Sequence, residues 1–207
     1  VDTNIADFTN GLTLVKTDEK RIDETYSLRT AKTSKVHYQA NQLNLTYDTK
    51  RKHQMVVTFN VANNDVAFRY SFPQTGETSC MVVNGEATAF KLPQHTTTFI
   101  CPQSDAMVGW KRTKPSYEEY YAIAKPLSEK SQYGHGYTFP CLFKVDDDGW
   151  VLISETGVDG RYCGSRLSDS RLINKDTADT EDTSDDELYY SYKIEYPMAE
   201  ENNGNGS

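Results

Sequence analysis

The chain has 207 residues, of which 37% are hydrophobic and 12% aromatic, and its formal net charge is −8 at pH 7. This length allows a packed core without disulfides or a structural metal, which excludes a miniprotein. The mean hydropathy is −0.70, and the longest apolar runs, such as Trp150–Ile153, are too short for a membrane span.

The negative charge is concentrated at the C-terminal end. Residues 168–207 hold 11 of the 30 acidic residues and 3 of the 22 basic ones, so they carry the whole net charge. A net-negative chain lacks the positive field on which nucleic-acid binding depends, so no nucleic-acid partner is expected. We predict one domain over residues 1–198, with an acidic loop over 168–187, followed by a linker or disordered end over 199–207.

The start of the chain also bears on its organisation. Residue 1 is Val, and Val1–Phe8 lacks the charged and then apolar pattern of a signal peptide. The sequence therefore indicates a processed or excised piece of a longer polypeptide.

Short alternating segments separated by turn residues predict strands along most of the chain. Val66, Phe68, Tyr70 and Phe72 share one face of a strand, because side chains alternate between the two faces. Further strands and hairpins are expected in this order: Gln39–Tyr47; Met55–Val61 paired with Val66–Phe72; Met81–Val83 paired with Glu86–Leu92 through an Asn84-Gly85 turn; Cys141–Val145 paired with Trp150–Glu155; and Leu188–Tyr196.

One short helix is predicted over Ser116–Ala124. Ser116 suits the N-cap, Glu119 follows at capping-box spacing, and Pro126 ends the segment. Many strands and one short helix favour an all-β fold, either an antiparallel β-sandwich or a barrel-like sheet.

Cysteine and histidine spacing gives no metal motif. Cys80, Cys101, Cys141 and Cys163 contain no C-x-x-C pair, so two disulfides and buried free thiols both stay open. The histidines, His37, His53, His95 and His135, share no ligand spacing.

Glu155 is the first candidate site residue. It follows the apolar strand Trp150–Ile153 at the point where the strand meets a loop. A carboxylate there needs a cation, several hydrogen-bond donors or solvent. Calcium binds six to eight oxygens, so Glu155 would be one ligand among several.

Aromatic residues indicate a second candidate site. Trp110, Tyr117 and Tyr121 lie close together in sequence beside Glu118. Flat rings with nearby polar groups suit a sugar, which offers an apolar face and a rim of hydroxyls. These residues also suit core packing against a sheet.

Three segments together resemble the N-terminal domain of glycoside hydrolase family 97. They are Asp65–Pro73, Tyr117–Tyr120 and Asp147–Glu155, and they occur in the family's order and approximate spacing. The resemblance extends from about Phe8 to Pro197 and implies a β-sandwich of the galactose-mutarotase-like super-sandwich type.

The resemblance also implies a function for the parent enzyme. Family members are secreted or periplasmic bacterial hydrolases of α-linked glycans that use calcium, and a (β/α)8 catalytic barrel follows this domain in the same polypeptide. By the resemblance, Glu155 is the glutamate that this domain supplies to calcium. Trp110, Tyr117, Glu118 and Tyr121 would lie toward the substrate pocket.

The chain also departs from the family pattern. Strands that open the family's domain before the position of Phe8 are not seen, so a sheet edge is expected to be unpaired. Glycoside hydrolysis needs two carboxylates, so the chain alone is predicted to be inactive, with calcium binding weak or absent. The alternatives are a free-standing carbohydrate-binding module built on Trp110 and a ligand-free surface domain.

Overall fold

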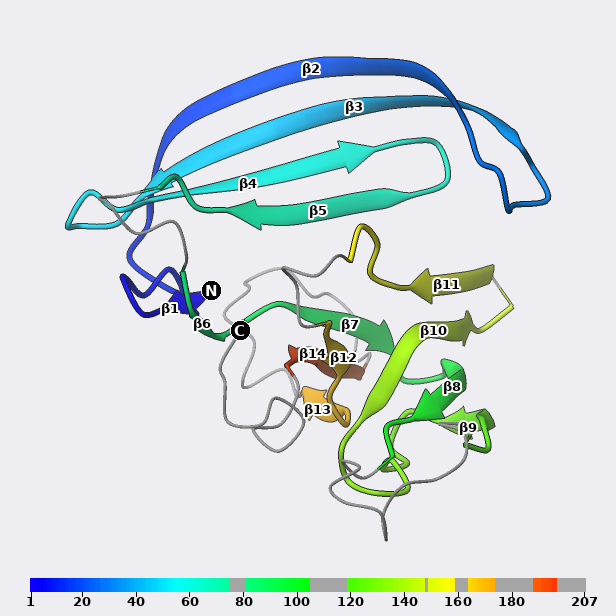
Figure 1. Cartoon of the computed structure of the whole chain (residues 1–207). Coiled ribbons are helices and arrows are strands. Elements are labelled where there is room, and N and C mark those ends of the chain that lie inside the picture. Colours follow the sequence, from blue (N-terminus) through cyan, green and yellow to red (C-terminus); the bar gives the residue numbers. More distant parts are fainter. Residues whose placement is uncertain (75–80, 105–118, 148, 159–163, 174–187, 197–207) are drawn as a thin grey trace, which may run out of the picture. The chain divides into compact units, whose positions relative to one another are not determined.

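The computed structural model describes residues 1–74, 81–104, 119–147, 149–158, 164–173 and 188–196. These residues form strands and no helix, so no membrane-spanning helix is found among them. The strands of the two larger sheets pair antiparallel (Figure 1). The prediction of an all-β, antiparallel β-sandwich class is confirmed. The chain divides into two compact units, Val1–Asn84 and Gly85–Ser207, called here the N-terminal and C-terminal units.

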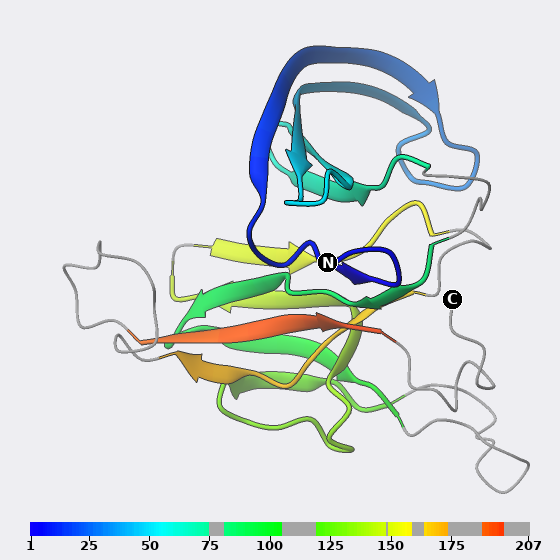
Figure 2. The same ribbon diagram turned by 90° about the vertical axis from the view of Figure 1, so that its left-hand side faces the viewer.

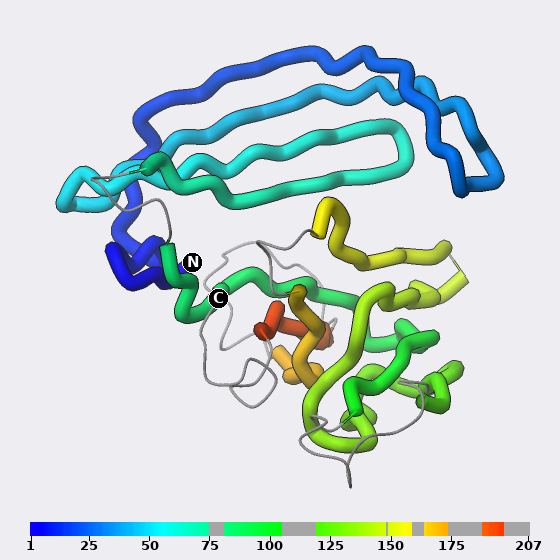
Figure 3. The backbone as a smooth tube through the Cα atoms, viewed as in Figure 1, coloured from blue at the N-terminus to red at the C-terminus, as the bar shows by residue number. Residues whose placement is uncertain are grey.

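The N-terminal unit is built on a four-stranded sheet in the order β2-β3-β4-β5. Its strands are β2 (Thr13–Ser27), β3 (Lys35–Asp48), β4 (Gln54–Val61) and β5 (Val66–Ser71). Figure 3 shows the long β2 and β3 curving side by side. Two short strands, β1 (Asp2–Thr3) and β6 (Val83–Gly85), form a separate pair.

The two faces of this sheet differ in chemistry because side chains alternate along each strand. On one face the register pairs Leu45 with Val57 and Val57 with Tyr70, beside a cluster that includes Phe8 and Met55. On the other face polar side chains bond across the strands. Gln42 donates to Asn60 at 2.9 Å, and Thr58 donates to the Asn44 side-chain oxygen at 2.7 Å.

The C-terminal unit contains the larger, eight-stranded sheet. Its strands are β7 (Ala89–Pro93), β8 (Thr97–Pro102), β9 (Ala122–Pro126), β10 (Tyr137–Val145), β11 (Gly149–Ile153), β12 (Arg166–Leu167), β13 (Arg171–Ile173) and β14 (Tyr189–Glu195). The main order is β13-β14-β12-β10-β8-β9, with β7 beside β14 and β11 beside β10 (Figure 2).

A continuous core lies against one face of this sheet. Ile100, Phe143 and Leu167 are fully buried, and Tyr192 packs against Phe143 with ring centroids 5.4 Å apart. Alternation explains the choice of residues: Phe143 points into the core, and its neighbour Leu142 points to the opposite face. The core therefore fixes which side chains of β8, β10 and β11 face outward.

Two of the predicted hairpins are confirmed. β4 pairs with β5, and Ala62 N–H donates to the Asp65 carbonyl at 2.9 Å across the turn. β10 pairs with β11, with Val145 opposite Gly149. The single strands expected at Gln39–Tyr47 and Leu188–Tyr196 are present as β3 and β14.

The predicted Asn84-Gly85 hairpin is wrong. Both residues lie within β6, which pairs with β1, while β7 pairs with β14. Val82 donates its N–H to the Asn4 side chain at 3.1 Å and accepts from Asn4 N–H at 3.0 Å. The long-range partner near the chain start thus overrides the local turn preference.

The predicted helix is wrong over its described part, residues 119–124. Ala122 and Ile123 belong to β9 and pair with Ile100 and Phe99 of β8. Cross-strand bonding to β8 outweighs a capping pattern that lacked an apolar helical stripe. The first part, Ser116–Glu118, lies outside the described residues.

The segment predicted as an acidic loop, residues 168–187, contains a strand near its beginning. Arg171–Ile173 form β13 and pair with Tyr189–Ser191 of β14. The rest of that segment and the predicted end over 199–207 lie outside the described residues. Cys101 and Cys141 are free thiols, and burial raises the pKa of Cys141 to about 12.

Asp48, at the end of β3, is expected to make the stability of the N-terminal unit dependent on pH. A hydrogen bond from Gln54 at 2.9 Å and the ammonium of Lys52 at 3.3 Å lower the pKa of Asp48 below its ordinary value of 3.8. A lowered folded-state pKa gives stability that is present above pH 3.8 and disappears as the pH falls through the folded value.

Asp48→Asn should therefore lower the Tm near pH 6, and its difference from wild type should shrink as the pH falls to about 3. Thermal unfolding at a series of pH values measures this. Asp147→Asn removes a fully exposed carboxylate that forms a loose surface ion pair with Lys144 at 3.6 Å, and it controls for the lost charge. A constant difference from wild type at every pH would contradict the assignment.

Candidate metal-ligand site at Glu155

Glu155 lies two residues beyond the end of β11, as its sequence position predicted. β11 is anchored by pairing with β10, where Ile153 lies opposite Cys141 and is buried. The next residue, Ser154, is exposed, and Glu155 is half-buried. The apolar strand therefore delivers the carboxylate to the boundary between the core and the loop.

The Glu155 carboxylate accepts hydrogen bonds from Ser165. The Ser165 hydroxyl donates to Oε2 at 2.9 Å, and the Ser165 N–H donates to Oε2 at 3.0 Å and less closely to Oε1 at 3.3 Å. The sequence allowed a cation, hydrogen-bond donors or solvent as the partner of Glu155. Among the described residues, the partner is the pair of hydrogen-bond donors on Ser165. Bonds to a charged acceptor are among the stronger hydrogen bonds in proteins.

The position of Ser165 is set by strand β12, which follows it directly. In β12, Arg166 lies opposite Thr138 of β10 and Glu195 of β14, and Leu167 is fully buried. Gly164 precedes Ser165 with φ +75°, in the left-handed region that glycine enters without steric cost. A glycine in the left-handed conformation and a buried strand thus flank Ser165.

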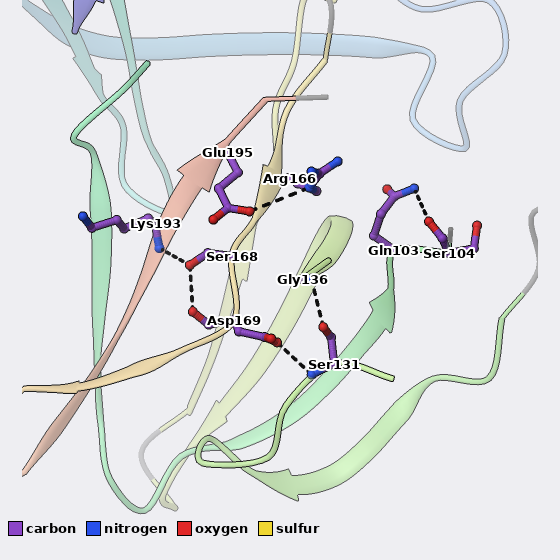
Figure 4. A network of polar contacts seen from close by, with 9 residues as sticks. All are labelled: Gln103, Ser104, Ser131, Gly136, Arg166, Ser168, Asp169, Lys193 and Glu195. Carbon is purple, nitrogen blue, oxygen red and sulfur yellow. Dashed lines mark hydrogen bonds and ion pairs between the residues drawn. The ribbon is translucent and has the colours of Figure 1, made fainter. Parts of the chain in front are cut away.

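A polar network holds the chain just after β12 (Figure 4). Asp169 accepts from Ser131 N–H at 2.7 Å, and the Ser131 hydroxyl oxygen accepts from Gly136 N–H at 2.9 Å. On the other side, the Ser168 hydroxyl oxygen accepts from Lys193 N–H at 2.9 Å. The loop before β10, the segment after β12 and strand β14 are therefore tied together.

The carboxylate of Glu155 has the chemistry of one calcium ligand. Calcium prefers carboxylate and carbonyl oxygens and takes six to eight of them. Within the described residues, Oε2 accepts two bonds and Oε1 one longer bond, so Oε1 retains lone-pair capacity for a cation. No group of three or more metal-ligating side chains is found in the described parts of the chain.

Only one predicted substrate-pocket residue is described. Tyr121 is half-exposed and packs on Phe99, with ring centroids 5.0 Å apart. It lies beside β9, while Glu155 follows β11, at the other end of the run β9-β8-β10-β11. Strands β8 and β10 therefore lie between β9, which follows Tyr121, and β11, which precedes Glu155. Trp110, Tyr117 and Glu118 lie outside the described residues.

Sequence reasoning missed Ser165. It lies 10 residues after Glu155, and its role depends on β12 pairing between β10 and β14. A two-residue strand shows too little alternation to be found from sequence. Gly164 is the one local signal, because a glycine before a polar residue marks a possible tight turn.

Comparison with known proteins identifies the family. Residues 1–198 match the family described as "Glycosyl-hydrolase 97 N-terminal". The chain therefore belongs to the N-terminal domain family of glycoside hydrolase 97. No curated protein matches the sequence.

Solved structures agree with this assignment. A structure titled as a beta-arabinopyranosidase is 52% identical, with a TM-score of 0.82, and the match covers 100% of this chain and 30% of that one. Glycoside hydrolase family 97 enzymes from Pseudoalteromonas sp. strain K8, in complexes with panose and with acarbose, are 16% identical. Their TM-score is 0.63, and the matches cover 94% of this chain and 29% of theirs. The chain thus spans about 30% of the length of these structures.

Proposed function

We propose that this domain is a non-catalytic part of a calcium-dependent glycosidase, that it packs on a catalytic (β/α)8 barrel and that it supplies Glu155 to the active-site calcium. The geometry of Glu155 is the main support for this proposal. Its carboxylate lies just beyond the end of a strand, Ser165 donates two hydrogen bonds to Oε2, and Oε1 can still accept a cation. When bound, calcium supplies a positive field that positions substrate and stabilises developing negative charge.

An exposed apolar row supports packing on a further domain. Ile123, Phe99, Leu142 and Leu152 lie side by side across β9, β8, β10 and β11, on the face opposite the core. Ile123 is 58% exposed and Leu152 63%, and Trp150, two residues from Leu152, is 61% exposed. Exposed apolar rows of this kind mark interaction surfaces. The partner that we propose is the catalytic part of the same polypeptide, because the chain covers only 30% of the 52% identical structure.

The relatives also indicate a substrate class. The 52% identical structure is titled a beta-arabinopyranosidase. In the L series, a β-arabinopyranoside has the ring configuration of an α-D-galactopyranoside without its C6 group. We therefore propose pyranosides of this configuration as substrates of the parent enzyme, among the α-linked glycans of the family, and a periplasmic or secreted location for it.

Glu155→Gln tests the proposal in the full-length enzyme that carries this domain. The variant keeps the side-chain shape and loses the charge, so we expect calcium to bind at least about tenfold more weakly. Titration of the calcium-stripped enzyme with calcium, followed by hydrolysis of aryl α-galactoside and aryl β-L-arabinopyranoside, measures affinity and activity together.

Ser154→Ala is the matched control. Ser154 is the exposed neighbour of Glu155, and among the described residues its hydroxyl donates to the Glu155 carbonyl at 3.3 Å. Its calcium affinity should stay at the wild-type value. An unchanged calcium affinity in Glu155→Gln would refute the ligand role.

A further inference from the structure

We infer that Ser165 is a positioning residue for Glu155: its hydroxyl and N–H hold Oε2 so that Oε1 is presented to the cation. This inference rests on the proposed function, because it assigns the orientation of the same ligand. Ser165 contacts the proposed metal ligand, Glu155, and is not itself proposed as a ligand of the metal.

The unequal bonding of the two carboxylate oxygens carries the inference. Oε2 accepts the Ser165 hydroxyl at 2.9 Å and the N–H at 3.0 Å, while the N–H to Oε1 distance is 3.3 Å. Two donors from one residue fix both the position and the rotation of the carboxylate plane. Oε1 is then the oxygen with more capacity for a further positive partner.

Ser165 itself is held by buried structure. The following residues, Arg166 and Leu167, are buried between β10 and β14. Lys130 donates to the Ser170 carbonyl at 2.6 Å, and Ser168 N–H donates to the Lys193 carbonyl at 2.8 Å. The donor is thus part of a fixed segment, so Glu155 is oriented before a cation arrives.

Prior orientation affects affinity because a free glutamate side chain loses rotational freedom when it binds a metal. Residues that bond to a metal ligand typically change metal affinity about 10- to 100-fold when removed. Ser165→Ala removes the hydroxyl and keeps the N–H, so about a tenfold loss is expected. Ser165→Thr keeps a hydroxyl and should restore most of the affinity.

The experiment measures calcium binding without reference to activity. Isothermal titration calorimetry with calcium alone is carried out on the calcium-stripped full-length enzyme and on four variants, Glu155→Gln, Ser165→Ala, Ser165→Thr and Ser154→Ala. Tm values of the same proteins without calcium report any purely structural effect. We expect Ser165→Ala to lose affinity while its calcium-free Tm stays within about 2 °C of wild type.

The outcomes separate this inference from the proposed function. Weak binding in both Glu155→Gln and Ser165→Ala, with recovery in Ser165→Thr, supports both. Weak binding in Glu155→Gln alone overturns the positioning role and leaves the ligand role intact. Wild-type binding in Glu155→Gln overturns both. A loss in Ser165→Ala that follows a large fall in calcium-free Tm and is not recovered in Ser165→Thr assigns a structural role and overturns the inference.

Discussion

Replacing Gly136 by alanine is expected to destabilise the C-terminal unit by about 3–5 kcal/mol. A Cβ at this position would lie 2.0 Å from the Leu167 carbonyl oxygen and 3.0 Å from the Cα of Ser168. Both are backbone atoms, so no flexible side chain can move aside. The φ of Gly136 is +77°, which adds the strain of a left-handed conformation.

The segment cannot shift easily to relieve this clash. Gly136 N–H donates to the Ser131 hydroxyl oxygen at 2.9 Å, and the Gly136 carbonyl accepts from Gln103 N–H at 2.8 Å. Leu167, on the other side of the clash, is fully buried. Moving either partner therefore breaks hydrogen bonds or opens the core.

Gly134→Ala is the matched control for this substitution. Gly134 also has a positive φ, +73°, but no atom lies within 4 Å of the position that an added Cβ would take. It should cost only the conformational strain, about 1–2 kcal/mol. Urea unfolding followed by circular dichroism measures both variants. Equal losses in the two would show that Gly136 and Leu167 are not in close contact.

Phe143→Ala is expected to destabilise the same unit by about 3–5 kcal/mol. The Phe143 side chain is fully buried in the core and packs on Tyr192. Removing its ring leaves a cavity between β10 and β14, because the surrounding strands are held by their own pairing. Urea unfolding again gives the loss in free energy.

Phe99→Ala, one strand away, removes the same side chain from the opposite face of the sheet. Phe99 is 40% exposed and belongs to the apolar row proposed as the packing surface. In the isolated chain its loss should cost less than about 2 kcal/mol. If Phe99→Ala proved as damaging as Phe143→Ala, the assignment of the core to one face would be wrong.

Strands with a buried face could be predicted from sequence. Met55 and Val57 in β4, and Cys141 and Phe143 in β10, are buried and repeat at the spacing that places them on one face. Successive side chains of a strand point to opposite faces of the sheet, so a strand with one buried face has apolar residues at every second position. Pattern and structure therefore agree in these strands.

Strand β2 could not be predicted in this way. Ile22 is its one buried residue, and charged side chains occupy both faces. Its conformation is set by backbone hydrogen bonding to β3 over residues 13–27. A strand held mainly by its neighbour leaves no alternation in its own sequence.

The site could be predicted in part. The position of Glu155 followed from an apolar strand that ends in a loop, a local pattern. Its partner Ser165 depends on the pairing of β10, β12 and β14, which no local pattern encodes. The Asn84-Gly85 prediction and the described part of the helix prediction, residues 119–124, failed for the same reason, since pairing partners outside each segment decided its conformation.

The charges on β2 also affect the solution behaviour of the domain. β2 forms one edge of its sheet, and an open edge can pair with a strand from another molecule. Lys16 and Asp18 form an exposed ion pair on this edge at 2.6 Å, and Lys20, Arg21 and Glu24 continue the charged run. A strand from another molecule would have to strip water from these groups. The charged run on β2 therefore disfavours edge-to-edge pairing with another molecule.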